Sequence, residues 1–92
     1  MWIMTQNKQR IINSDQIVDI FVNKAGDTIY AETVLDRDYF VLGEYDSRDL
    51  CLGFLDIYLN FLMADTRYFK MPEKDLMKKV IKEARKIFGT DN

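Results

Sequence analysis

One long apolar stretch, residues 47–65, constrains what this chain can fold into more than any other feature. Apolar side chains recur in it at helical spacing, and only a narrow face is polar or small. A helix this apolar must be covered by other elements on nearly all of its circumference. We predict a central helix over residues 46–65 with the stripe Leu50, Phe54, Ile57, Tyr58, Phe61 and Leu62, widened by Cys51, Leu55, Leu59 and Met63. The narrow face carries Asp49, Gly53, Asp56 and Asn60.

Residues 1–45 have the pattern of short antiparallel strands. Over residues 16–22, Val18, Ile20 and Val22 alternate with Ile17, Asp19 and Phe21, which is typical of a half-buried strand. The neighbouring runs of apolar and β-branched residues are separated by short polar turns, and turns this short force antiparallel pairing. The sequence therefore predicts a meander of about five strands.

After the central helix, the sequence indicates a connector followed by a second helix. Residues 66–71 form the connector, with room for an extended piece, and Pro72 fits a first helical position. An apolar stripe then runs to Phe88, and Gly89 is a suitable C-cap. We predict an amphipathic basic helix over residues 72–88. Ninety-two residues make one α+β domain, 1–92, in which two helices pack on one face of the meander.

The residue types needed for most enzyme and metal sites are missing. The chain has no histidine, which removes the usual general base and the commonest transition-metal ligand. Its single cysteine, Cys51, is expected to be a buried apolar residue. Glycines are scattered singly and form no phosphate loop. Five aspartates match no calcium loop, and four of them lie in predicted turns, where aspartate is expected anyway: Asp15, Asp19, Asp27, Asp36 and Asp38 are the five. We therefore expect no catalytic residue, metal or cofactor.

The net charge of −2 is unevenly distributed. Residues 1–45 hold four basic and seven acidic residues, whereas the segment 70–86 holds seven basic and three acidic ones. The second helix therefore has a basic side, on which the sequence places Lys74, Lys78, Lys82 and Arg85. A solvated helix face explains these residues best, an acidic protein partner second and nucleic acid third, because no aromatic residues are interleaved with them.

Aromatic and apolar residues are numerous for so small a core. Some of the six residues Trp2, Tyr30, Tyr39, Tyr45, Tyr58 and Tyr68 are expected at an interface. The two helices also offer more apolar surface than one face of a short meander can cover. We therefore expect a homodimer with Leu76, Val80 or Ile87 at the contact.

Targeting and membrane segments are not apparent. The longest apolar run is too short for a membrane span, and the charges near the N-terminus follow a very short apolar stretch, the reverse of a signal peptide. We expect a cytoplasmic protein that binds neither membranes nor small-molecule substrates.

Three short motifs occur at the start, the strand-to-helix junction and after the central helix: Trp2-Ile3-x-Thr5-Gln6, Tyr39-x-x-Leu42-Gly43-x-Tyr45-x-Ser47 and Met71-Pro72-Glu73. Together they resemble a group of small uncharacterised proteins of Gram-positive bacteria and their prophages, which has no assigned activity. The resemblance implies a mobile-element setting, in which small acidic proteins often bind and block a host machine, including the nucleases of CRISPR defence.

These observations favour a non-enzymatic interaction protein of a phage or prophage. Its most concrete version is an inhibitor of a host defence nuclease that occupies a positively charged nucleic-acid channel. The partner-binding acidic surface would consist of Asp19, Glu32, Asp36, Asp38 and Glu44. The first alternative is a small homodimeric structural or regulatory protein. The second is a weak nucleic-acid binder that uses the basic helix.

Overall fold

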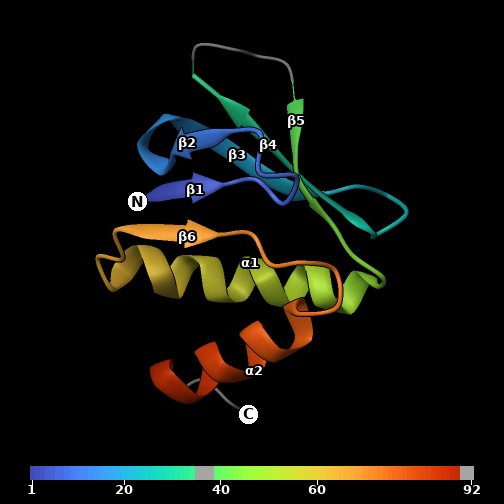
Figure 1. The fold of residues 1–92 in the computed structure, drawn as a ribbon, viewed down its shortest axis with the longest axis vertical. Coiled ribbons are helices and arrows are strands. Elements are labelled where there is room, and N and C mark those ends of the chain that lie inside the picture. Colours follow the sequence, from blue (N-terminus) through green and yellow to red (C-terminus); the bar gives the residue numbers. More distant parts are fainter. Residues whose placement is uncertain (35–38, 90–92) are drawn as a thin grey trace.

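The structure is a computed structural model that describes residues 1–34 and 39–89 (Figure 1). Its helices and strands confirm the α+β class. A single turn of 3-10 helix at Ser14–Gln16 separates the second and third strands. In chain order the elements are β1 (Trp2–Met4), β2 (Ile11–Asn13), β3 (Ile17–Val22), β4 (Thr28–Thr33), β5 (Tyr39–Glu44), α1 (Arg48–Met63), β6 (Tyr68–Lys70) and α2 (Met77–Phe88).

The expected five-stranded meander is replaced by two sheets of three strands each within the described residues. Strands β3, β4 and β5 form an antiparallel meander, whereas β1 pairs with β2 on one side and with β6 on the other. The pairing of β1 with β6 is parallel, with Ile3 opposite Phe69. Parallel strands require a long crossover connection, and the segment containing α1 supplies it. The central helix therefore connects strands instead of following a finished sheet.

Helix α1 occupies most of the predicted range. Ser47 is its N-cap, with a side-chain oxygen that accepts a hydrogen bond from the backbone N–H of Leu50 at 3.2 Å. Its buried face includes Cys51, Phe54, Ile57 and Tyr58. The helix lies between the sheets and α2 (Figure 1).

The expectation that α1 is covered on nearly all sides was wrong. Leu59 is 61% exposed and Met63 86% exposed, and together with Leu52 and Asp56 they form one face of α1 that no other described element covers. Gly53, expected on the polar face, is instead buried against α2. A Cβ atom added there would lie 2.9 Å from Cδ1 of Ile81, so glycine allows α2 to approach closely.

Helix α2 begins five residues later than predicted. The carbonyl oxygen of Pro72 accepts hydrogen bonds from the Tyr45 hydroxyl at 2.9 Å and from the Gln6 side-chain amide at 3.2 Å. Pro72 is therefore held at a junction between segments and does not open the helix. The predicted C-cap is confirmed, since Gly89 ends α2 in the left-handed conformation with φ of 67°.

The three sequence motifs meet at this junction. The Gln6 side chain donates to the carbonyl of Glu44 and accepts from its N–H, both at 2.9 Å. Gly43 is required because an added Cβ would lie 2.7 Å from the Tyr45 hydroxyl. The Gln6, Gly43, Tyr45 and Pro72 residues of the motifs thus join β1, β5 and the segment after β6.

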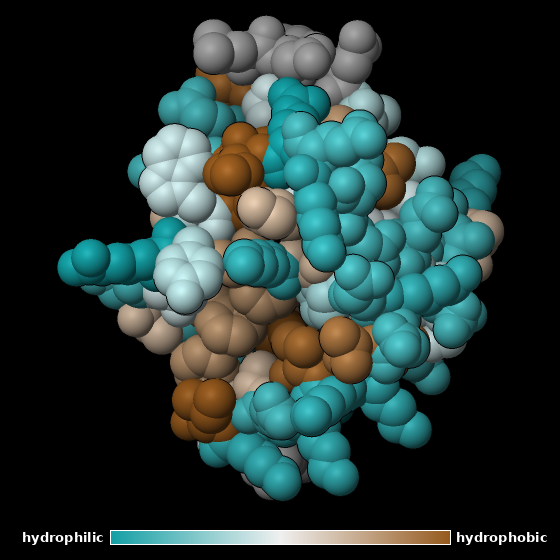
Figure 2. Space-filling model, in the orientation of Figure 1, coloured by the Kyte–Doolittle hydropathy of each residue, from teal (hydrophilic) through white to brown (hydrophobic). Residues whose placement is uncertain are grey.

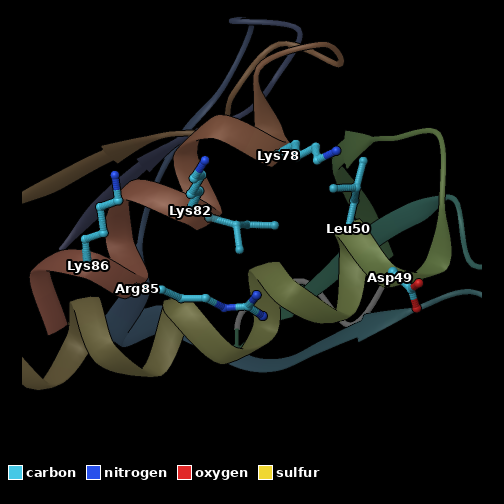
Figure 3. Close-up of a pocket in the computed structure, with 7 residues that line it drawn as sticks. Asp49, Leu50, Lys78, Lys82, Arg85 and Lys86 are labelled. Carbon is cyan, nitrogen blue, oxygen red and sulfur yellow. The ribbon is translucent and has the colours of Figure 1, made fainter. Parts of the chain in front are cut away.

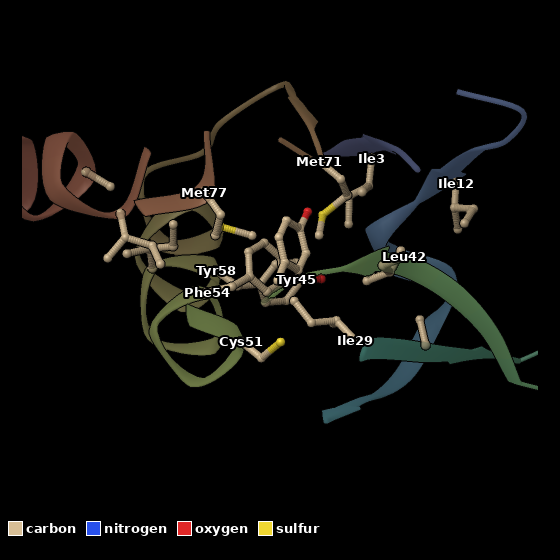
Figure 4. Close-up of a cluster of buried hydrophobic side chains, with 14 residues drawn as sticks. Ile3, Ile12, Ile29, Leu42, Tyr45, Cys51, Phe54, Tyr58, Met71 and Met77 are labelled. Atoms are coloured by element: carbon tan, nitrogen blue, oxygen red, sulfur yellow. The ribbon is translucent and has the colours of Figure 1, made fainter. Parts of the chain in front are cut away.

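One cluster of buried side chains links the sheets to both helices (Figure 4). Phe54 is fully buried, as predicted, while Phe61 is partly buried and packs on Phe69 and Phe88. Cys51 is a free, fully buried thiol, as expected, and burial raises its pKa. Burial also raises the pKa of Tyr45 above its ordinary value of 10.0.

Candidate functional site

Two of the predicted acidic residues lie side by side on one face of the β3–β4–β5 sheet. The strand register places Asp19 opposite Glu32 and Glu32 opposite Tyr39. Asp19 is exposed and Glu32 partly exposed. Like charges directly opposite each other destabilise a sheet. We therefore expect this pair to make the face negative and to lower folding stability slightly.

Three aromatic rings on the same sheet form a cluster, which we call the outer aromatic cluster: Phe21, Tyr30 and Tyr39. The Phe21 and Tyr30 rings stack with centroids 5.5 Å apart, and the Phe21 and Tyr39 rings meet edge to face at 4.7 Å. Tyr39 is 59% exposed. Phe21 and Tyr30 belong neither to the core nor to the side chains packed against it. These rings therefore order one another on the surface.

The alternation of residues 16–22 correctly placed Asp19 and Phe21 on one face of a strand. The cluster itself was not predicted from the sequence, because which rings touch depends on how three strands are aligned with one another. The only available signal was the same alternation in β4, where Tyr30 and Glu32 are two residues apart. Of the predicted interface aromatics, Tyr45 and Tyr58 are instead buried, whereas Trp2, Tyr39 and Tyr68 are exposed.

The remaining predicted acids do not join this face as a group. Glu44 pairs with Thr28, four residues along β4 from Glu32, which corresponds to about 13 Å. Asp36 and Asp38 lie outside the described residues. The structure therefore brings together Asp19 and Glu32, with Glu44 at the far end of the sheet.

The predicted basic residues divide between two places. Lys74 precedes α2 and forms an ion pair with Asp46 at 3.2 Å. Lys78, Lys82 and Arg85 line a groove between α1 and α2, together with Lys86, which the sequence reasoning omitted. Lys86 follows Lys82 at helical spacing, and that signal would have identified it.

The groove between α1 and α2 has a volume of about 540 Å³ (Figure 3). Leu50 and Ile81 supply its apolar lining, and Asp49 lines it from α1. Arg85 reaches across toward α1, where its guanidinium lies 4.0 Å from the Asp56 carboxylate. For Lys78, Lys82 and Lys86 the described residues provide no ion-pair partner. The groove therefore combines an apolar lining with a net positive charge.

The residues expected at a dimer contact are only partly available. Leu76 is 46% exposed and Ile87 is 76% exposed, while Val80 is half-buried against the core. Figure 2 shows hydrophobic surface gathered on the lower half of one side of the molecule, below β6 and toward α2. Trp2 and Tyr68, which are neighbours in the register of β1 and β6, add exposed aromatic surface to the first sheet.

Metal-binding clusters and membrane-spanning helices are absent from the part of the chain that the structure describes. No group of three or more acidic or cysteine residues in residues 1–34 and 39–89 is arranged to hold a metal ion. None of the helices in these ranges has the length and apolar character needed to span a membrane.

Comparison with family models, curated proteins and solved structures found no match for this chain.

Proposed function

We propose that this chain is a non-enzymatic protein-binding module. It docks one face of its β3–β4–β5 sheet onto a basic surface of another protein. This outer face is the one that carries Asp19, Glu32 and the outer aromatic cluster. The observation that carries the proposal is the outer aromatic cluster beside the Asp19–Glu32 pair. Rigid aromatic side chains supply most of the binding energy in many interfaces, and complementary charge speeds the encounter.

The outer aromatic cluster and the Asp19–Glu32 pair are already arranged for binding in the free protein. The rings are held by one another, so little side-chain freedom remains to be lost on binding. The like-charged pair lowers folding stability slightly, and a cationic partner would relieve that repulsion. Both features favour a partner with positive charge around an apolar or aromatic contact.

The most concrete form of the proposal is inhibition of a host defence nuclease in the cytoplasm of a bacterium that carries the phage or prophage. The resemblance of the three motifs to prophage proteins supports that setting. In this form, Asp19 and Glu32 would compete with nucleic-acid phosphates for cationic residues of the nuclease, and Tyr39 would contact the apolar parts of the channel.

A DNA-cleavage assay with a panel of purified RNA-guided nucleases tests this form. We expect dose-dependent inhibition of at least one nuclease. The double variant Asp19→Asn/Glu32→Gln and the single variant Tyr39→Ala should weaken it, whereas Lys79→Gln on α2 should not. Inhibition that survives both sheet variants, or is lost equally in the Lys79 control, would contradict the proposal.

Self-association through α2 is a second candidate, favoured by the exposure of Leu76 and Ile87. A contact between copies would cover these side chains and add to the half-buried Val80. Light scattering at tens of micromolar should then give a dimer mass that Ile87→Glu reduces to a monomer. The control Lys79→Glu, also on α2, should leave the mass unchanged, and a monomeric wild-type chain would exclude the candidate.

A further inference from the structure

We propose that the groove between α1 and α2 is a binding site for an acidic peptide segment in extended conformation, with carboxylates at alternate positions and apolar residues between them. The site lies on elements other than the β3–β4–β5 sheet. It is therefore separate from the proposed function, and the failure of either proposal leaves the other standing.

The charge of the groove favours an anionic occupant. Lys78, Lys82 and Lys86 line one wall, and none of them has an ion-pair partner among the described residues. Arg85 is only loosely paired, at 4.0 Å from Asp56. Four cationic side chains thus meet in one groove of a chain whose net charge is −2. Bringing like charges together without partners is unfavourable in the free protein, and a bound carboxylate would relieve it.

The spacing of the lysines matches an extended peptide. Residues four apart on a helix are separated by about 6 Å along its axis. Alternate residues of an extended strand are separated by about 6.6 to 6.8 Å and point to the same side. Carboxylates at every second position would therefore meet Lys78, Lys82 and Lys86 in turn.

The lining of the groove favours peptide over nucleic acid. Leu50 and Ile81 offer apolar contacts to the residues between the carboxylates. No aromatic side chain is among the described residues that line the groove, so bases would find no stacking platform. The carboxylate of Asp49 also lines the groove, and Asp56 lies beside Arg85. Both acids lower the net positive charge of the groove, which limits the number of anionic groups that any bound segment can place there.

Fluorescence anisotropy with a labelled peptide that alternates Glu and Leu tests the site on the intact chain. We expect saturable binding that falls about fivefold or more in Lys78→Gln/Lys82→Gln, since each exposed ion pair contributes modestly. Lys79→Gln is the matched control, because Lys79 is exposed on the same helix but does not line the groove, and its affinity should change less than about twofold. Unchanged thermal melts would show that each variant is folded.

Three outcomes would overturn the proposal. Equal loss in the Lys79 variant would show that only the overall charge of α2 attracts the peptide. Equal affinity for a peptide with all its Glu residues in one block would exclude the alternating arrangement. Displacement of the peptide by a single-stranded oligonucleotide of equal charge at a lower concentration would reassign the groove to nucleic acid.

Discussion

The junction around Tyr45 and the outer aromatic cluster use aromatic residues in opposite ways. Tyr45 is 1% exposed and donates to the Pro72 carbonyl, so its ring and its hydroxyl both join distant segments. Phe21 and Tyr30 pack on each other without reaching the core. We therefore expect changes at the junction to destabilise the fold strongly, and changes in the outer aromatic cluster to destabilise it only slightly. Four predictions test that contrast, from the largest expected effect to the smallest.

Removing a ring from the core should have the largest effect. Phe54→Ala deletes a fully buried side chain and leaves a cavity, which destabilises a protein by about 3–5 kcal/mol. Phe21→Ala should cost only about 1 kcal/mol, mostly from lost ring contacts. Urea denaturation of both variants checks the difference. Equal destabilisation would show that the outer cluster is part of the core.

A methyl group at the junction should have the next largest effect. Gly43→Ala places a Cβ 2.7 Å from the Tyr45 hydroxyl and 2.8 Å from its ring, and overpacking of this kind costs about 1–3 kcal/mol. The thermal midpoint should fall accordingly. A midpoint equal to that of the wild type would mean that Tyr45 can move aside, and that the junction is looser than its contacts indicate.

Alkaline pH should distinguish the buried Tyr45 from the exposed tyrosines. The pKa of Tyr45 is raised by burial from 10.0, so above pH 10 the unfolded state loses the phenolic proton first. Above pH 10 the unfolded state therefore binds fewer protons than the folded state, and the free energy of unfolding falls as the pH rises. Below pH 10 the stabilisation that comes from the protonated Tyr45 is fully present.

Tyr45→Phe should flatten this decline. Its stability should be lower by about 1 kcal/mol at neutral pH, from the lost hydrogen bond to Pro72. Between pH 10 and roughly 11.5, the free energy of unfolding of the Tyr45→Phe variant should fall by up to about 1.4 kcal/mol less per pH unit than that of the wild type. Tyr39→Phe serves as the exposed control. Parallel pH profiles for wild type and Tyr45→Phe would contradict a buried, protonated Tyr45.

Neutralising the acidic pair should have the smallest effect on folding. Asp19→Asn removes one of two like charges that face each other across β3 and β4, so stability should stay within about 0.5 kcal/mol and tend to rise. Chemical denaturation in low salt measures it. A loss of more than about 1 kcal/mol would show that the pair supports the sheet and would remove its functional interpretation.

The sequence allowed the class of the fold and the central helix to be predicted because both depend on local periodicity. The alternation around Asp19, the cap at Gly89 and the burial of Phe54 were likewise local signals. The pairing of β6 with β1 was not predictable from the sequence. Strand β6 has only three residues, and a strand this short carries little information about which distant strand it pairs with. The prediction that Pro72 begins the second helix was wrong for a related reason. Its carbonyl accepts hydrogen bonds from Gln6 and Tyr45, which are far away in the chain.

The candidate surfaces were predicted less completely. Helical spacing placed Lys78, Lys82 and Arg85 on one side of α2, but the groove also requires the packing of α2 on α1, which the spacing within α2 does not determine. The outer aromatic cluster depends on the register of three strands, which composition and alternation do not determine.

Photo-crosslinking from the outer face is the most direct test of the account. One protein carries benzoylphenylalanine in place of Tyr39, and a second carries it in place of Lys79 on α2; both are expressed in Gram-positive host cells. We predict that the Tyr39 probe crosslinks a basic, nucleic-acid-binding protein, and that Asp19→Asn/Glu32→Gln in the same chain abolishes the product. Crosslinks from the Lys79 position with none from the Tyr39 position would contradict the account.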